Sequence, residues 1–294
     1  MRITSTIQAR VFLENLSRLK TQQDQAQTEL STGKTVNRLS DNPFAAAQTS
    51  RLDSVMAEND QFITVDQQLQ SKLQMTDSVL QSLNSSVDSA KSLVAQALSG
   101  TTTPESRAAI VTALGGVRDQ ILSASNTQFD GNFLFAGTQT STQPFVDTGG
   151  TVQYNGNDEA IYQRLDRSVV VQTNVTGQDL FVDAPSVFTV IDNLKTAIQN
   201  NDSAAIQTGL NDLDTISNRI NTTDAVVGNN IQLTDQVVNT LRTHNQSLQD
   251  HVSTMTDADL AKSITNLNLT TQAINASLGA QGQVQQLSLL DYLR

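Results

Sequence analysis

Hydrophobic residues recur along much of the chain at alternating spacings of four and three, the heptad pattern of packed α-helices. Asn42 can cap such a helix, and Pro43 suits its first position. The pattern therefore predicts one helix from Pro43 to about Gly100, which would be about 80 Å long at 1.5 Å per residue. The stripe keeps this alternating spacing without a break and consists of Phe62, Asp66, Leu69, Leu73, Thr76, Leu80, Leu83, Val87, Ala90, Val94 and Ala97.

Similar stripes lie near both ends of the chain. The N-terminal stripe consists of Phe12, Leu16, Leu19, Gln23, Ala26 and Leu30. Towards the C-terminus, one stripe consists of Val238, Leu241, Asn245, Leu248, Val252 and Met255, and another of Leu260, Ile264, Leu267, Thr271, Ile274 and Leu278. The five-residue step between these two stripes predicts a joint near Asp257–Asp259. Shorter helices are predicted over residues 104–129, 186–199 and 202–221.

The middle of the chain, residues 130–184, is rich in glycine and aromatic residues and predicts β-structure. An aromatic run at 131–138 and the segment 168–172 are predicted strands. The segments 151–154 and 161–165 alternate polar and apolar residues, and Asn155-Gly156 between them predicts a hairpin. The resulting fold class is mainly α with a small inserted β module, an elongated rod of long antiparallel coiled-coil-like helices from both termini.

The terminal stripes are weakly apolar because Ala, Thr, Asn and Gln interrupt them. An isolated helix of this kind is marginal in water. Residues 263–290 contain no charged residue, which leaves two interpretations. Either this segment is a helix surrounded by other protein, or it is a low-complexity tail that stays disordered in the monomer.

Composition narrows the possible chemistry of these 294 residues. Cysteine is absent, which excludes disulfides and thiolate sites, and the two histidines, His244 and His251, are too far apart on one helix face for one metal ion. A net charge of −11 argues against nucleic-acid binding. We expect no enzyme activity and no cofactor. The sequence also shows no signal peptide and no apolar stretch long enough for membrane insertion.

A family resemblance is carried by the segment between the first two predicted helices. Residues 30–43 resemble the end of the conserved N-terminal helix of flagellins, with Asp41 in a variant of that family's Asp-Asp-Pro motif. The motif residues are Leu30, Ser31, Thr32, Gly33, Asp41, Asn42 and Pro43. Residues 216–232 resemble a second helical landmark, although Asn229 stands where an arginine is common. The end of the chain, residues 259–293, is similar to the C-terminal helix of the family.

A second motif resembles a junction branch of this superfamily more than the filament subunit itself. It consists of Phe133, Leu134, Phe135, Ala136, Gly137 and Thr138, and the ending 287–293 agrees with it. The resemblance implies a structural subunit that joins the flagellar hook to the filament. Two alternatives stay open: a flagellin-type filament subunit, and a secreted coiled-coil fibre or adhesin protein.

The resemblance also implies a division of the chain. Residues 1–43 would form an N-terminal helix for assembly and export that pairs with a C-terminal assembly helix, 256–294. Residues 44–129 and 185–255 would form the two parts of the helical rod, and 130–184 the outer β module. The expected assembly seam consists of Phe12, Leu16, Leu19, Leu30, Leu260, Ile264, Leu267, Ile274 and Leu278.

The implied partners are other flagellar proteins. They are further copies of this chain in a ring, the preceding junction protein on the hook side, flagellin, the flagellar export machinery and an export chaperone. The resemblance places the protein outside the cell, at the hook–filament junction, after export without a cleaved signal peptide.

Overall fold

The computed structural model describes residues 2–99 and 103–292, with side chains described for 6–7, 9–99 and 103–283. The chain forms two compact units, residues 1–58 with 244–294, and residues 59–243. Both boundaries fall inside long helices, α2 (Pro43–Leu98) and α5 (Ser203–Thr256). The five-part division expected from the sequence stays a prediction.

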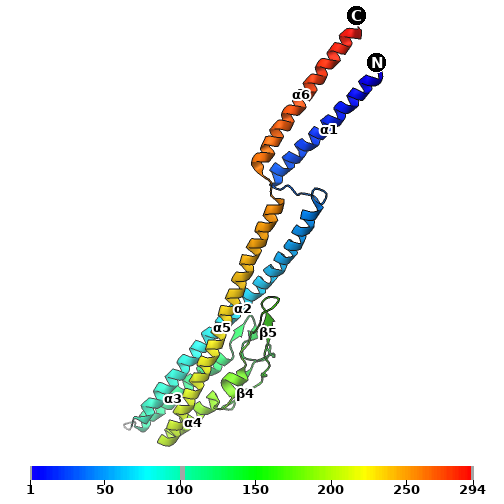
Figure 1. Ribbon diagram of the computed structural model, residues 1–294. Coiled ribbons are helices and arrows are strands. Elements are labelled where there is room, and N and C mark those ends of the chain that lie inside the picture. The colour runs from blue at the N-terminus through cyan, green and yellow to red at the C-terminus, as the bar shows by residue number, and fades with distance from the viewer. Residues whose placement is uncertain (1, 100–102, 293–294) are drawn as a thin grey trace. The chain divides into compact units, whose positions relative to one another are not determined.

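In the first unit, the terminal helices α1 (Arg2–Thr32) and α6 (Leu260–Tyr292) lie side by side and antiparallel (Figure 1). Helix α1 ends at Thr32, and the next residue, Gly33, has a φ of +71°, a conformation that glycine adopts without strain. Helix α6 begins after Asp259, whose carboxylate accepts the Lys262 backbone N–H at 3.1 Å. The joint predicted between α5 and α6 is confirmed.

Helix α2 begins where the sequence predicts. The Asn42 side chain accepts the Ala45 backbone N–H at 3.1 Å, and Pro43 is the first helical residue. The predicted end at Gly100 lies outside the described residues. Every member of the long stripe from Asp66 to Ala97 is buried, and Phe62 is half-buried.

The second unit is built around α2 and α5, together with α3 (Pro104–Ser125) and α4 (Val187–Gln199). The prediction of a separate helix over 202–221 is wrong, because α5 continues without interruption to Thr256. Its buried residues Ile220, Val227 and Val237 extend one apolar face past the expected end. No proline follows Pro185, so nothing in the backbone chemistry stops the helix.

The β module consists of three separate two-stranded antiparallel ribbons. The first joins β1 (Gln128–Phe129) to β2 (Asn132–Phe133), the second β3 (Phe145–Thr148) to β4 (Thr151–Tyr154), and the third β5 (Tyr162–Arg164) to β6 (Val170–Gln172). The predicted hairpin between 151–154 and 161–165 is therefore wrong. Gly149 and Gly150, both at positive φ, form a two-residue turn that pairs β4 with the preceding strand instead.

The aromatic run at 131–138 is a strand only at its start, which corrects the prediction of a strand through Thr138. Leu134, Phe135 and Ala136 turn into the core. There Phe135 packs edge to face against Phe181, with ring centroids 5.3 Å apart. Phe181 lies on the π-helical turn η1 (Gln178–Val182). The module is thus held by a small aromatic core rather than by an extended sheet.

Candidate assembly interface

The two terminal helices contact each other through small and polar side chains. Gln23 donates to the Thr271 hydroxyl at 3.0 Å, and the Ser263 hydroxyl donates to Glu29 at 2.7 Å. At the base of the pair, the backbone N–H of Ala258 donates to the Gly33 carbonyl at 2.8 Å. These successive contacts run antiparallel and fix the register of α1 against α6.

The structure divides the nine expected seam residues into two groups. Six are half-buried on the facing sides of the pair: Phe12, Leu16, Leu19, Leu30, Leu267 and Ile274. The other three, Leu260, Ile264 and Leu278, are 49%, 50% and 50% exposed. Ser263 and Ala26 take the fully buried positions between the helices. The apolar side chains of α6 therefore lie partly against α1 and partly on the surface of the unit.

Further apolar side chains on the same helices are exposed although they lie outside the expected seam. They are Ile7, Val11 and Leu13 on α1 and Leu269 on α6. Sequence analysis did not identify them because they interrupt the heptad spacing. The described part of this helix pair therefore exposes several apolar side chains beyond the expected seam.

The first family motif forms an ordered loop between α1 and α2. The Asp41 carboxylate accepts the backbone N–H groups of Asn37 and Arg38 at 3.0 and 2.8 Å. These bonds hold the pKa of the Asp41 carboxyl below its ordinary value, and the bond from Arg38 has the largest effect. Ser31 and Thr32 are exposed at the end of α1, and Leu30 is half-buried. The motif therefore terminates one helix and starts the next.

The second family motif is a buried turn. Gly137 has a φ of +64°, and a Cβ at this position would collide with Asn157. The Phe135 carbonyl accepts both the Gly177 backbone N–H at 2.9 Å and the Tyr154 hydroxyl at 3.0 Å. Thr138 is exposed and its backbone N–H donates to the Asn157 side chain at 2.8 Å. This motif supports the β module and presents little surface.

Sequence analysis missed one buried charge cluster. Arg118 lies among the apolar residues of α3 and contacts Asp147 at 2.7 Å and Asp192 at 3.2 Å. It holds the β3–β4 ribbon against α3 and α4. The signal that could have revealed it is an arginine between Val117 and Ile121 on an apolar helix face.

None of the helices in residues 2–99 and 103–292 combines the length and the apolar character that crossing a membrane requires. In the same part of the chain, no three His, Asp or Glu side chains come close enough together to hold a metal ion.

Comparison with known families identifies both ends of the chain. A model of the bacterial flagellin N-terminal helical region matches residues 3–140, and one of the C-terminal helical region matches residues 210–293. Flagellar hook-associated protein 3 of Escherichia coli is 35% identical over 155 residues, which cover 52% of this chain and 48% of that protein. The chain thus spans about half the length of this relative. The Salmonella typhimurium protein of the same name is 28% identical over 90% of this chain and 91% of its own length.

Solved structures share the fold. A putative flagellar hook-associated protein from Vibrio parahaemolyticus has a TM-score of 0.69 at 23% identity, covering 74% of this chain and 99% of that one. The flagellar junction protein FlgL from Legionella pneumophila has a TM-score of 0.60 at 14% identity, covering 73% and 100%. The mainly helical fold with an inserted β module, expected from the sequence, is confirmed.

Proposed function

Because the chain belongs to the flagellin family, whose N- and C-terminal helical regions it contains, we propose that it is a structural subunit of the bacterial flagellum that joins the hook to the filament. The observation that carries this proposal is the similarity to hook-associated protein 3 along 90% of the chain. The protein is not an enzyme, and its place is the flagellum.

The exposed apolar face of α1 and α6 is the proposed assembly surface. Its two residue groups have different roles: the half-buried group pairs the two helices, and Leu260, Ile264 and Leu278 meet neighbouring subunits. The pair alone buries little apolar area, so its full order depends on those neighbours. Such coupling of folding to assembly keeps monomers apart inside the cell.

The specific partners belong to the same proposal. Copies of this chain form a ring layer, which meets the preceding hook-associated protein on one side and flagellin on the other. The subunit reaches its site through the flagellar export machinery, with an export chaperone and without a cleaved signal peptide. Lack of cysteine is compatible with passage as an unfolded chain.

The two alternative functions predict different locations of the protein. A filament subunit would be present along the whole shaft, and a secreted coiled-coil fibre or adhesin would be absent from flagella. Immunogold electron microscopy of intact flagella, with antibody raised against residues 131–184, separates the three. We expect a narrow band at the hook–filament boundary. Label along the shaft would contradict the junction role, and label absent from flagella would contradict a flagellar role.

A truncation tests the role of the terminal helices. We expect that removing residues 1–40 and 255–294 abolishes incorporation between hook and filament. Incorporation of the truncated chain at wild-type levels would show that the terminal helices are not the assembly surface.

A further inference from the structure

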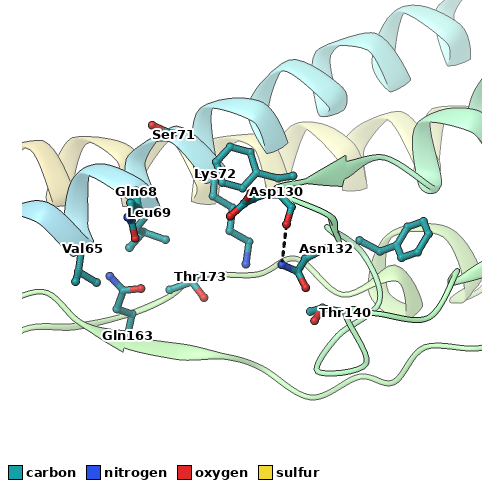
Figure 2. A pocket seen from close by; sticks show the side chains of 12 residues that line it. Val65, Gln68, Leu69, Ser71, Lys72, Asp130, Asn132, Thr140, Gln163 and Thr173 are labelled. Atoms are coloured by element: carbon teal, nitrogen blue, oxygen red, sulfur yellow. Dashed lines mark hydrogen bonds between the residues drawn. The ribbon is translucent and has the colours of Figure 1, made fainter.

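An open pocket of about 720 Å³ lies between helix α2 and the β1–β2 ribbon, within the unit formed by residues 59–243 (Figure 2). Its wall carries one cation, Lys72, and one carboxylate, Asp130. These opposite charges favour neither an anionic nor a cationic ligand. A more specific arrangement lies in the other unit, at the base of the terminal helices.

In that unit, the segment between α1 and α2 is joined by its backbone to the segment between α5 and α6. Lys34 and Asp257 form an isolated antiparallel bridge. The Thr35 N–H and the Thr35 hydroxyl both donate to the Thr256 carbonyl, at 2.7 and 3.0 Å. Thr256 is buried and ends α5, so its carbonyl is one that a helix end leaves without an intrahelical partner. The bridge supplies that partner.

A further backbone bond lies on the other side of the bridge, where the Ala258 N–H donates to the Gly33 carbonyl at 2.8 Å. We call this bond and the two bonds from Thr35 the clasp. Gly33 alone lies between α1 and the bridge, and Ala258 and Asp259 alone lie between the bridge and α6. The clasp is therefore connected to each terminal helix by one or two residues.

These short connections restrict sliding of α6 along α1. A slip of one heptad would displace α6 by about 10 Å, at about 1.5 Å per residue. The three connecting residues together span at most about 10 Å when fully extended, and Gly33, with a φ of +71°, is not extended. A slip therefore requires the clasp to open or a helical turn to unwind.

The faces of the two helices oppose such a slip less strongly. Most expected seam residues are apolar and recur in heptads, so a shift of seven residues again places apolar side chains opposite each other. The polar layer is an exception, because Gln23 donates to the Thr271 hydroxyl at 3.0 Å. Both side chains of this layer are only half-buried, so water can replace their hydrogen bond.

We propose that the clasp, rather than the helix faces, sets the register of α1 against α6. It thereby sets the position along the pair at which α6 presents its exposed residues Leu260, Ile264 and Leu278. The inference rests on the proposed function, in which these side chains meet neighbouring subunits. Copies in a ring make equivalent contacts only if every copy has the same register. Thr35 and Ala258 are thus positioning residues for the assembly surface.

Two substitutions of Thr35 test the clasp. Thr35→Pro removes the N–H that donates to Thr256, whereas Thr35→Ala removes only the hydroxyl. Each variant replaces the wild-type chain in cells, and immunoblots measure the variant in purified flagella and in the culture medium. We expect Thr35→Pro to be incorporated several-fold less than Thr35→Ala, with chain in the medium showing that export continues.

A disulfide distinguishes a register defect from a general folding defect. The chain has no cysteine, so Gln23→Cys with Thr271→Cys creates a single possible pair at side chains that touch in this register. Combined with Thr35→Pro, this pair should restore incorporation to the level of Thr35→Ala. Gln23→Cys with Leu278→Cys, one heptad further along α6, should not restore it. Mass spectrometry identifies the disulfides that form.

Three outcomes would overturn the proposal. Equal incorporation of Thr35→Pro and Thr35→Ala would show that the helix faces set the register. Restoration by the offset disulfide as well, or no restoration although the disulfide between positions 23 and 271 has formed, would show that the clasp does not act through register. Failure of the proposed function differs from all three, because Thr35→Ala and the wild-type chain would then be absent from the flagella.

Discussion

The guanidinium of Arg118 donates to Asp147 Oδ2 at 2.7 Å and so connects helix α3 to strand β3. The same side chain donates to Asp192 on α4 and to the Gly150 carbonyl in the β3–β4 turn. Only 7% of the Arg118 side chain is exposed. One buried cation therefore fixes the β3–β4 ribbon on two helices.

Replacing this cation should strongly destabilise the protein. Arg118→Met leaves Asp147 and Asp192 without their partner, and we expect the free energy of unfolding to fall by about 3 kcal/mol. Lys195→Met is the control, because Lys195 contacts the same Asp192 from a more exposed position and should cost less than about 1 kcal/mol. Denaturant unfolding followed by circular dichroism measures both. Equal losses would mean that Arg118 contributes no more than a surface ion pair.

Stability should also depend on pH through Asp66. This residue is fully buried in the α2 stripe, its Oδ2 has no hydrogen-bond partner among the described residues, and Gln163 donates to its other oxygen at 3.4 Å. Burial raises the pKa of the Asp66 carboxyl to about 6; the bond from Gln163 opposes this rise and the charge of Asp166 adds to it.

The sign of the effect follows from this rise in pKa. The folded-state pKa exceeds the unfolded value, so ionised Asp66 weakens the fold by about 3 kcal/mol above pH 6, and the penalty disappears below about pH 4. We expect Asp66→Asn to be more stable relative to wild type at pH 7.5 than at pH 4. The exposed Asp119→Asn variant serves as the control. A stability difference between Asp66→Asn and wild type that does not change with pH would contradict the raised pKa.

Gly137 should tolerate no side chain. Gly137→Ala combines a positive φ with a collision against Asn157, whereas Gly149→Ala has a positive φ and open space. Gly137→Ala should lower the melting temperature markedly. Gly149→Ala should lower it less, because the positive φ alone costs only about 1–2 kcal/mol of unfolding free energy. Thermal unfolding of the two variants compares them directly. Similar melting temperatures would show that the turn adjusts around Asn157.

Replacing Gly116 should instead raise the stability of the protein. This residue lies exposed inside α3, and a Cβ there would meet nothing within 4 Å. A Cβ at the neighbouring Gly115 would also meet nothing within 4 Å, so neither glycine is a site of close packing. Gly116→Ala should stabilise the protein by about 1 kcal/mol in chemical denaturation, because alanine favours the helix. A loss of stability would indicate a contact that the helix needs glycine to make.

The two groups of terminal-helix residues should respond differently to substitution. Ile264→Ser changes an exposed residue, so we expect unchanged helical content of the free subunit but several-fold less protein in isolated flagella. Ile274→Ser changes a half-buried residue and should reduce the helical content of the free subunit as well. Circular dichroism measures the helical content of the free subunit, and immunoblots of purified flagella measure the amount of incorporated protein. Normal incorporation of Ile264→Ser would place the assembly surface elsewhere.

The amino-acid sequence alone determined the features that depend on neighbouring residues in the chain. The heptad spacing predicted α2 and its buried stripe, and Gly33, Asn42 and Pro43 marked where one helix ends and the next begins. These signals are local, because caps and turn residues act within a few positions and the apolar period acts within one helix. The motifs near Gly33 and Phe135 also pointed to the correct family.

Tertiary structure decided which segments meet. Strand β4 has a turn signal at each end, Gly149-Gly150 before it and Asn155-Gly156 after it. Only the folded structure shows that β4 pairs through the first turn, with β3. The heptads did not reveal that Leu267 faces α1 while Ile264 faces away, because the stripes are so diluted that Ser263 and Ala26 could take the inner positions. The pairing of Arg118 with Asp147 depends on distant segments, whose spacing along the chain carries no local signal.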